Sequence, residues 1–166
     1  MKILVTGSSG AGKTYFAQEF KKMSINAFDS DLIPNLDSWY YKEEKVSAPE
    51  IIDKEFLDNH SFLWNRKVLE EFLQNHPDVI IFGMSGNAFE MRDLFDKVYF
   101  LKVPPKIINV RVQHESRENP MGKTEEQRTA VLEWGAMIEK EARKLGFEFI
   151  DGTLAPKELL NILGSK

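Results

Sequence analysis

A glycine-rich stretch close to the start of the chain limits the possible folds more than any other feature. It runs Gly7-Ser8-Ser9-Gly10-Ala11-Gly12-Lys13-Thr14 and matches the pattern G-x-x-x-x-G-K-[ST] at every fixed position. The short apolar run KILVT precedes it, and Phe16, Phe20 and Met23 follow at helical spacing. The sequence therefore predicts a buried strand, a tight loop and a helix in immediate succession.

The residue types of this stretch suit the binding of a nucleotide's phosphates. Glycines let successive backbone N–H groups converge on phosphate oxygens, and the following helix adds the positive end of its dipole. Lys13 would contact the β- and γ-phosphates, and the Thr14 hydroxyl would join the shell of a Mg²⁺ ion. We therefore expect ATP and Mg²⁺ as cofactors, with residues 7–14 binding the nucleotide and Lys13 also catalytic. The alternative is a chance glycine-rich turn before a helix, and the strand that precedes the loop argues against it.

Four more short apolar runs indicate how the rest of the chain is organised. They cover residues 25–28, 79–82, 98–103 and 147–150. Helical patterns separate them, including one expected to start at Ser61 and one after Pro104-Pro105, whereas residues 32–60 show no regular pattern. Non-alternating strands separated by helices are typical of a parallel sheet covered on both faces. We expect one three-layer α/β domain over residues 1–166.

Charge and composition exclude several classes of protein. The formal net charge of −4 argues against a partner that is a nucleic-acid polymer, because such proteins are normally basic. The chain has no cysteine, which excludes disulfides and thiolate metal sites, and its three scattered histidines argue against zinc. No apolar run approaches the roughly 20 residues that span a bilayer, and no signal-like segment opens the chain. We expect a cytoplasmic protein with no membrane contact.

An acidic pair follows the second predicted strand. Asp29 and Asp31 flank Ser30, and ligands of open parallel sheets bind at the carboxyl ends of the strands. The run VIIF ends in Gly83 with no acid until Glu90, so the carboxylate that assists Mg²⁺ must come from elsewhere, and Asp29 is best placed. Asp31 would then face the acceptor. Helix capping by either aspartate is the alternative.

These motifs together resemble the nucleoside-monophosphate-kinase-like P-loop enzymes, and shikimate kinase in particular. The resemblance is carried by MKILVTGSSGAGKT and by FDSD, which is similar to the D-[ST]-D element of that family. It implies a P-loop NTPase fold with a five-stranded parallel sheet in the order 2-3-1-4-5, flanked by helices, with a small lid. It also implies that Asp29 assists Mg²⁺ and that Asp31 contacts or deprotonates an acceptor hydroxyl.

The resemblance extends to the second half of the chain. The lid is expected at about residues 112–125, where RENPMGKTEEQR is similar to the lid of kinase-like bacterial proteins. Lid arginines stabilise charge on the transferring phosphoryl group, which makes Arg117 a catalytic candidate and Arg111 and Lys123 nucleotide-binding candidates. Asp151 and Gly152 resemble the loop that packs on the adenine. A solvated charged loop is the alternative for the lid residues.

The acceptor region is expected at about residues 32–92, and it departs from shikimate kinase. Where that family has a triple glycine, this chain has Gly83-Met84-Ser85-Gly86-Asn87, of which Gly83 and Asn87 are candidates for acceptor binding. Arg92 is preferred over Arg66 as the cation for an anionic acceptor, with surface ion pairing as the alternative. Trp39, Tyr40 and Tyr41 would stack on a planar acceptor.

The sequence thus predicts a kinase that transfers the γ-phosphoryl group of ATP to a small-molecule or nucleotide acceptor, from a monomer or homodimer. The alternative is a nucleotide-gated ATPase that acts as a binding or assembly factor, because fold does not fix function.

Overall fold

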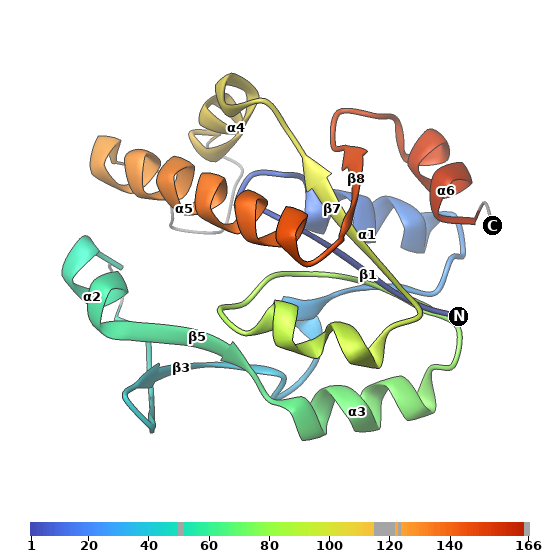
Figure 1. The fold of residues 1–166 in the computed structure, drawn as a ribbon, viewed down its shortest axis with the longest axis horizontal. Coiled ribbons are helices and arrows are strands. Elements are labelled where there is room, and N and C mark those ends of the chain that lie inside the picture. The colour runs from blue at the N-terminus through green and yellow to red at the C-terminus, as the bar shows by residue number, and fades with distance from the viewer. Residues whose placement is uncertain (50–51, 115–121, 123, 165–166) are drawn as a thin grey trace.

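Five strands form one parallel sheet in the computed structural model, which describes residues 1–49, 52–114, 122 and 124–164 (Figure 1). The strand order is β2-β6-β1-β7-β8. Renumbered within the sheet this is 2-3-1-4-5, so the predicted α/β fold and strand order are confirmed. The strands are β1 (Lys2–Gly7), β2 (Ala27–Asp29), β6 (Val79–Phe82), β7 (Lys97–Lys102) and β8 (Glu148–Asp151).

Helices cover both faces of this sheet because its central strands are apolar on both sides. Ile3 and Val5 of β1 pack with one cluster, whereas Leu4 between them packs with the other. The first cluster includes residues of α1 (Lys13–Lys22), α4 (Pro105–Val112) and α6 (Pro156–Gly164), and the second those of α3 (Arg66–Asn75) and the 3-10 helix η2 (Ala88–Leu94). The C-terminal half of α5 (Glu125–Lys144) packs on Phe100. Within the described ranges, no helix is long and apolar enough to cross a membrane.

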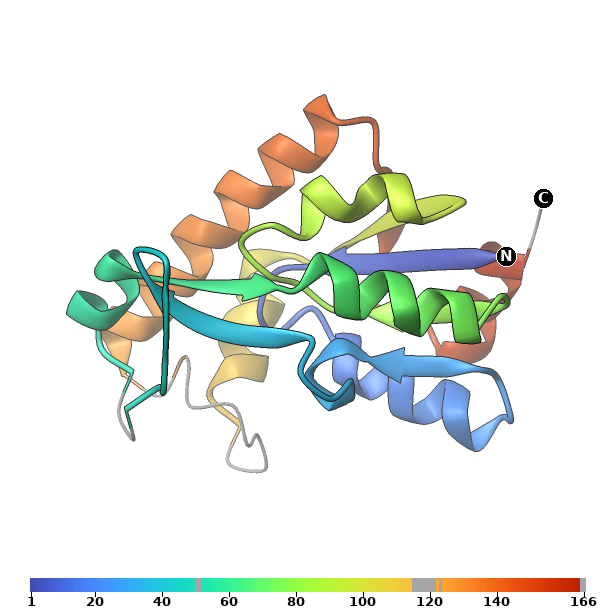
Figure 2. The same ribbon diagram turned by 90° about the horizontal axis from the view of Figure 1, so that it is seen from below.

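A second, antiparallel sheet occupies the region expected to lack regular structure, so that prediction was wrong. Its order is β4-β3-β5, and the helix α2 precedes β5 (Figure 2). The hairpin between β3 and β4 turns at Lys42, whose φ of 54° is left-handed without the Asn or Gly that usually marks such a turn. The elements are β3 (Asp37–Tyr41), β4 (Glu44–Val46), α2 (Lys54–Asn59) and β5 (His60–Trp64).

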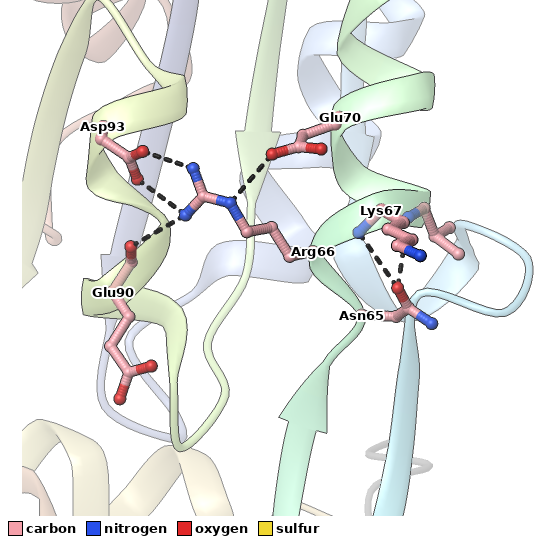
Figure 3. Close-up of polar contacts among 7 residues, drawn as sticks. Asn65, Arg66, Lys67, Glu70, Glu90 and Asp93 are labelled. Atoms are coloured by element: carbon pink, nitrogen blue, oxygen red, sulfur yellow. Dashed lines mark hydrogen bonds and ion pairs between the residues drawn. The ribbon is translucent and has the colours of Figure 1, made fainter.

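The helix predicted with Ser61 as its cap is displaced by four residues: its cap is Asn65 and it starts at Arg66. Residues 60–64 pair with β3 instead, and the Asn65 side chain caps α3 by accepting from the Lys67 and Val68 N–H groups at 3.0 and 3.4 Å (Figure 3). The Asn65 N–H also donates to the Leu36 carbonyl at 2.7 Å. This bond joins the two ends of the segment of the chain that forms the small sheet.

The helix α5 links this segment to the rest of the domain. Thr124 and Gln127 form a capping box at its start, and α2 packs beside the same end of α5 (Figures 1 and 2). Gln127 is buried, and its Nε2 donates to the Ile52 carbonyl at 2.9 Å. One side chain therefore both caps a helix and holds the segment before α2.

Candidate active site

The glycine-rich loop leads from β1 into α1 in the conformation that its sequence requires. Gly10 and Gly12 have φ angles of 81° and 99°, in the left-handed region that side chains disfavour. The Ala11 N–H donates to the Ser8 carbonyl at 3.1 Å and closes the turn. A β-carbon on Gly10 would lie 2.9 Å from Cγ1 of Val112 in α4. Backbone conformation and packing therefore both require glycine at this position.

Lys13 and Thr14 occupy the first turn of α1, directly after the loop. Lys13 Nζ donates to the carbonyls of Gly7 and Ser8 at 2.8 and 3.0 Å, so the ammonium group lies over the loop. Thr14 is exposed. Their predicted contacts with the phosphates of a nucleotide and with Mg²⁺ stay predictions.

Arg111 joins the loop to the turn that follows the edge strand β8. Its Nη1 donates to the Gly10, Ala11 and Gly152 carbonyls at 3.4, 3.2 and 3.4 Å, and its Nη2 donates to Gly152 at 3.4 Å. The predicted nucleotide-binding residues Gly10, Ala11, Arg111 and Gly152 are thus brought together. The sequence alone did not show that Arg111 would serve carbonyl oxygens of the loop.

Asp151 lies in the same place, beside Gly152. Hydrogen bonds from the Thr153 side chain and backbone N–H hold the pKa of its carboxyl group below the ordinary value, and the Arg111 charge acts in the same direction. Asp151 therefore shapes the turn after β8, and its role toward the adenine stays a prediction.

The acidic pair lies at the carboxyl end of β2. Asp29 is buried and its Oδ1 accepts from the Asp31 N–H at 3.1 Å, so it caps the short helix η1 (Ser30–Leu32) as the alternative had proposed. Asp31 reaches solvent, yet desolvation and then the like charge of Asp29 raise the pKa of its carboxyl group. The Ser30 hydroxyl and the Lys13 ammonium act against this rise. The loop and the acidic pair lie at the same edge of the sheet, because β1 and β2 both run parallel to β6.

A third carboxylate, Asp37, joins this pair and was not singled out from the sequence. It begins β3 and is half-buried. Desolvation first, and then the charges of Asp31 and Asp29, raise the pKa of Asp37 to about 6, while Lys45 acts in the opposite direction. The small sheet places this residue, and because that sheet was not predicted, no local pattern pointed to Asp37.

The turn after β6 packs tightly at the same edge of the sheet. A β-carbon on Gly83 would lie 2.8 Å from Cζ2 of Trp64, and closer still to Cβ and Oγ of Ser30. The Asn87 side chain accepts from the Trp64 N–H at 2.8 Å and donates to the Trp64 carbonyl at 3.0 Å. Both residues therefore join the turn to its neighbours, and their expected contacts with an acceptor stay predictions.

Arg92 and Trp64 lie near this turn, the first exposed and the second buried. Arg92 is exposed on η2, and its predicted role with an acceptor likewise stays a prediction. Trp64 is only 3% exposed, and its indole Nε1 is buried without a hydrogen-bond partner among the described residues.

The predicted lid residues Arg117 and Lys123 lie outside the described residues.

The family assignment rests on a match that spans most of this architecture. The family model described as an AAA domain matches residues 3–133, from β1 into α5. The chain belongs to the AAA domain family. The match includes the phosphate loop, all three carboxylates and Arg111. No curated protein matches this AAA-domain chain significantly.

Solved structures similar to this AAA-domain protein are P-loop kinases. Shikimate kinase from Acinetobacter baumannii, in complex with shikimate, has a TM-score of 0.57 and 16% identity, over 98% of this chain and 92% of that one. Shikimate kinase from Bacteroides thetaiotaomicron has a TM-score of 0.57 and 18% identity, over 99% of each chain. Deoxyadenosine kinase from M. mycoides with bound dATP has a TM-score of 0.51 and 18% identity, over 99% of this chain and 100% of that one. The predicted resemblance to shikimate-kinase-like P-loop proteins is confirmed as a likeness of fold.

Proposed function

We propose that this AAA-domain protein is a kinase that transfers the γ-phosphoryl group of ATP to a hydroxyl group of a small molecule. One observation carries the proposal: β1, which leads into the phosphate loop, and β2, which ends at Asp29, both pair in parallel with β6, so the loop and the acidic pair follow the same edge of the sheet. A donor phosphate held by the loop would lie beside a carboxylate that can receive a proton. Positioning of donor and acceptor supplies much of the catalysis in phosphoryl transfer.

The donor side consists of the loop and the first turn of α1. Backbone N–H groups of residues 7–14 would hold the phosphate oxygens, and Lys13 would exchange its bonds with the Gly7 and Ser8 carbonyls for bonds with phosphate. Arg111 would keep the loop fixed to the turn at Gly152, where Asp151 also lies, next to the expected adenine. The roles of Arg117 and Lys123 in the lid remain part of the proposal.

The residues present also fit a Mg²⁺ ion. Among the described residues no group of three acidic or histidine side chains could hold a metal ion by itself. Mg²⁺ at nucleotide sites takes most of its ligands from phosphates and water and needs only one or two from the protein. The Thr14 hydroxyl and the Asp29 carboxylate would hold it, and the accumulated negative charge of Asp29 and Asp31 favours a cation there. When bound, the ion would neutralise charge on the phosphoryl oxygens.

The acceptor side begins with Asp31. The acceptor hydroxyl oxygen would bond to the γ-phosphorus, the bond from that phosphorus to the ADP oxygen would break, and Asp31 would take the hydroxyl proton. A carboxylate with a raised pKa is the better base for this transfer. The proposed acceptor side is completed by Gly83, Asn87 and Arg92. Because Gly83 has no side chain, Ser30 and Trp64 can pack directly against its backbone.

The test is Mg-ATP turnover, measured as ADP release, with and without a panel of nucleosides, nucleoside monophosphates, sugar acids and shikimate. We expect one acceptor class to raise ADP release, Lys13→Ala to abolish it, and Asp31→Asn to lower the rate at saturating acceptor. Asp29→Asn should instead shift the Mg²⁺ dependence. Slow ADP release that no acceptor changes would contradict the kinase proposal and favour a nucleotide-gated ATPase.

A further inference from the structure

The first part of the acceptor region, residues 32–65, is acidic and contains no arginine. Between residues 32 and 65 the sequence has seven aspartates and glutamates, three lysines and no arginine. Proteins that bind carboxylates or phosphates commonly use arginine, because its planar guanidinium matches both groups in a bidentate manner. This segment therefore lacks the usual means of recognising an anionic acceptor.

The carboxylates of the site gather where the acceptor would meet the donor phosphate. Asp37 lies opposite Trp64 across the β3–β5 ladder, and Gly83 packs against both Trp64 and Ser30, the residue between Asp29 and Asp31. The charges of Asp29 and Asp31 accordingly act on Asp37. Among the described residues, Lys13 acts on Asp31 and Lys45 acts on Asp37 as the opposing cations. Lys13 belongs to the phosphate loop, and Lys45 is an exposed residue of β4. An anionic acceptor would thus enter beside three like charges.

The two arginines that follow the segment do not change this balance. Figure 3 shows the Arg66 guanidinium enclosed by acceptors: it pairs with Asp93 and with Glu70, and it donates to the Glu90 carbonyl. These bonds tie α3 to η2 and leave the guanidinium neutralised. Arg92 is exposed on η2 and acts on the same Asp93. Arg66 therefore offers no unopposed charge to the acceptor, and Arg92 supplies a single positive charge against the three carboxylates.

Aromatic residues follow Asp37 on the small sheet, and we call Trp39, Phe56 and Phe62 the aromatic row. Asp37, Trp39 and Tyr41 share one face of β3, because side chains alternate along a strand. Their partners across the ladder are Trp64, Phe62 and His60, respectively. The Trp39 ring lies 5.0 Å from that of Phe56 and 5.2 Å from that of Phe62, and all three residues are half-buried. This row is chemically suited to the flat or apolar part of a ligand.

We infer that the acceptor is an uncharged or cationic alcohol with a flat ring, and not a carboxylate or a phosphate. The inference rests on the proposed kinase function and narrows its substrate class. Asp37 would repel an anion or attract a cationic group, while the aromatic row would receive the ring. A nucleoside or a ring-bearing amino alcohol has this chemistry. Its hydroxyl oxygen would bond to the γ-phosphorus as the bond to ADP breaks, and its proton would pass to Asp31.

The experiment compares pairs of molecules that differ in charge and share free hydroxyl groups: all of them in the shikimate pair, and the 2′- and 5′-hydroxyls in the adenosine pair. Suitable pairs are shikimate with its methyl ester, and adenosine 3′-monophosphate with adenosine. Each is titrated onto the full chain with Mg²⁺ and a non-hydrolysable ATP analogue, and each is tested for ADP release with ATP. The key variant is Asp37→Asn. The matched control is Asp53→Asn, which removes one charge from the same segment while preserving the cap of α2.

We expect the uncharged member of at least one pair to bind ten-fold or more tightly than its anionic partner. Asp37→Asn should reduce that ratio at least three-fold, Asp53→Asn should leave it unchanged, and Trp39→Leu should weaken binding without changing the charge preference. Tighter binding of the anionic members, or an unchanged ratio in Asp37→Asn, would overturn the inference. Turnover that prefers an anion would overturn it while the kinase function stands. If no acceptor bound or stimulated turnover, the kinase function would fail, and the inference with it.

Discussion

Replacing Gly83 by alanine tests how tightly the acceptor edge of the sheet is packed. The new β-carbon would lie 2.8 Å from Trp64 Cζ2 and even closer to two side-chain atoms of Ser30. Ser30 is 0% exposed and Trp64 is 3% exposed, so neither has space into which it can move. The Gly83 N–H also donates to the Val5 carbonyl at 3.1 Å, which restrains the backbone. Gly83 has an ordinary φ, so the cost is steric.

The magnitude follows from the number of close contacts. Overpacking a filled core costs about 1–3 kcal/mol, and three contacts with enclosed neighbours place this variant near the upper end. We therefore expect the free energy of unfolding to fall by about 3 kcal/mol. In a chain of 166 residues this lowers the melting temperature by roughly 6–12 °C. The nucleotide-binding loop should stay intact, because the clash lies at Ser30 and Trp64.

The assay is urea unfolding followed by circular dichroism, with Gly146→Ala as the control. Gly146 has a φ of 77° but no atom within 4 Å of an added β-carbon, so that variant carries only the backbone cost of about 1–2 kcal/mol. A Ser30→Gly/Gly83→Ala double variant should recover about 1–2 kcal/mol of coupling energy, because the Ser30 contacts disappear. A Gly83→Ala variant as stable as the parent, or no coupling with Ser30→Gly, would refute the packing argument.

Three further outcomes are expected. Asp37 keeps its proton to about pH 6 in the folded state and only to about its ordinary value when unfolded, so its contribution to stability falls as pH rises from 4 to 6. After allowance for solvent screening, we expect this loss to be about 1 kcal/mol and to be absent from Asp37→Asn, with the free energy of unfolding measured at both pH values. If the parent and the variant differed by the same amount at pH 4 and pH 6, the prediction would be contradicted. Asn87→Ala removes both bonds to the Trp64 backbone and should cost about 2–3 kcal/mol in urea unfolding, with Asn65→Asp as a cap-preserving control. Arg111→Gln should weaken nucleotide binding at least three-fold in titration calorimetry, whereas equal affinity would mean that its bonds to Gly10 and Ala11 do not shape the loop.

The phosphate loop and the main sheet were predictable because each is encoded locally. The loop needs Gly10 and Gly12 for its left-handed backbone, and the strands are apolar on both faces, which leaves a continuous signal in the sequence. The small sheet was missed because its strands are half-buried and its hairpin turns at Lys42 without the usual glycine or asparagine. Ser61 was mistaken for a helix cap because serine is a common one, whereas pairing with β3 keeps residues 60–64 extended.

The residues of the candidate site likewise fall into two groups, those that local sequence predicted and those that it did not. Lys13, Thr14, Asp29 and Asp31 follow from short motifs and from the rule that ligands bind at strand carboxyl ends. Asp37 was not found, since its place at the start of β3 depends on the long-range pairing of β3 with β5, which was not predicted. The bonds of Arg111 depend likewise on the turn after β8, which is remote in sequence. Contacts across large sequence separations are what a local pattern cannot supply.

The bond between the Asn65 N–H and the Leu36 carbonyl has a consequence for engineering and for divergence. It makes residues 37–64 a cassette whose two ends meet at one point beside the main sheet. Doubling the length of such a closed segment costs only about 0.6 kcal/mol in closure entropy, so cassettes of different size can be exchanged without disturbing the phosphate loop. Among the described residues, a transplant must accommodate two side chains that bond to this segment from outside it: Gln127, which needs a carbonyl in place of that of Ile52, and Asn87, which bonds to the backbone N–H and carbonyl of Trp64.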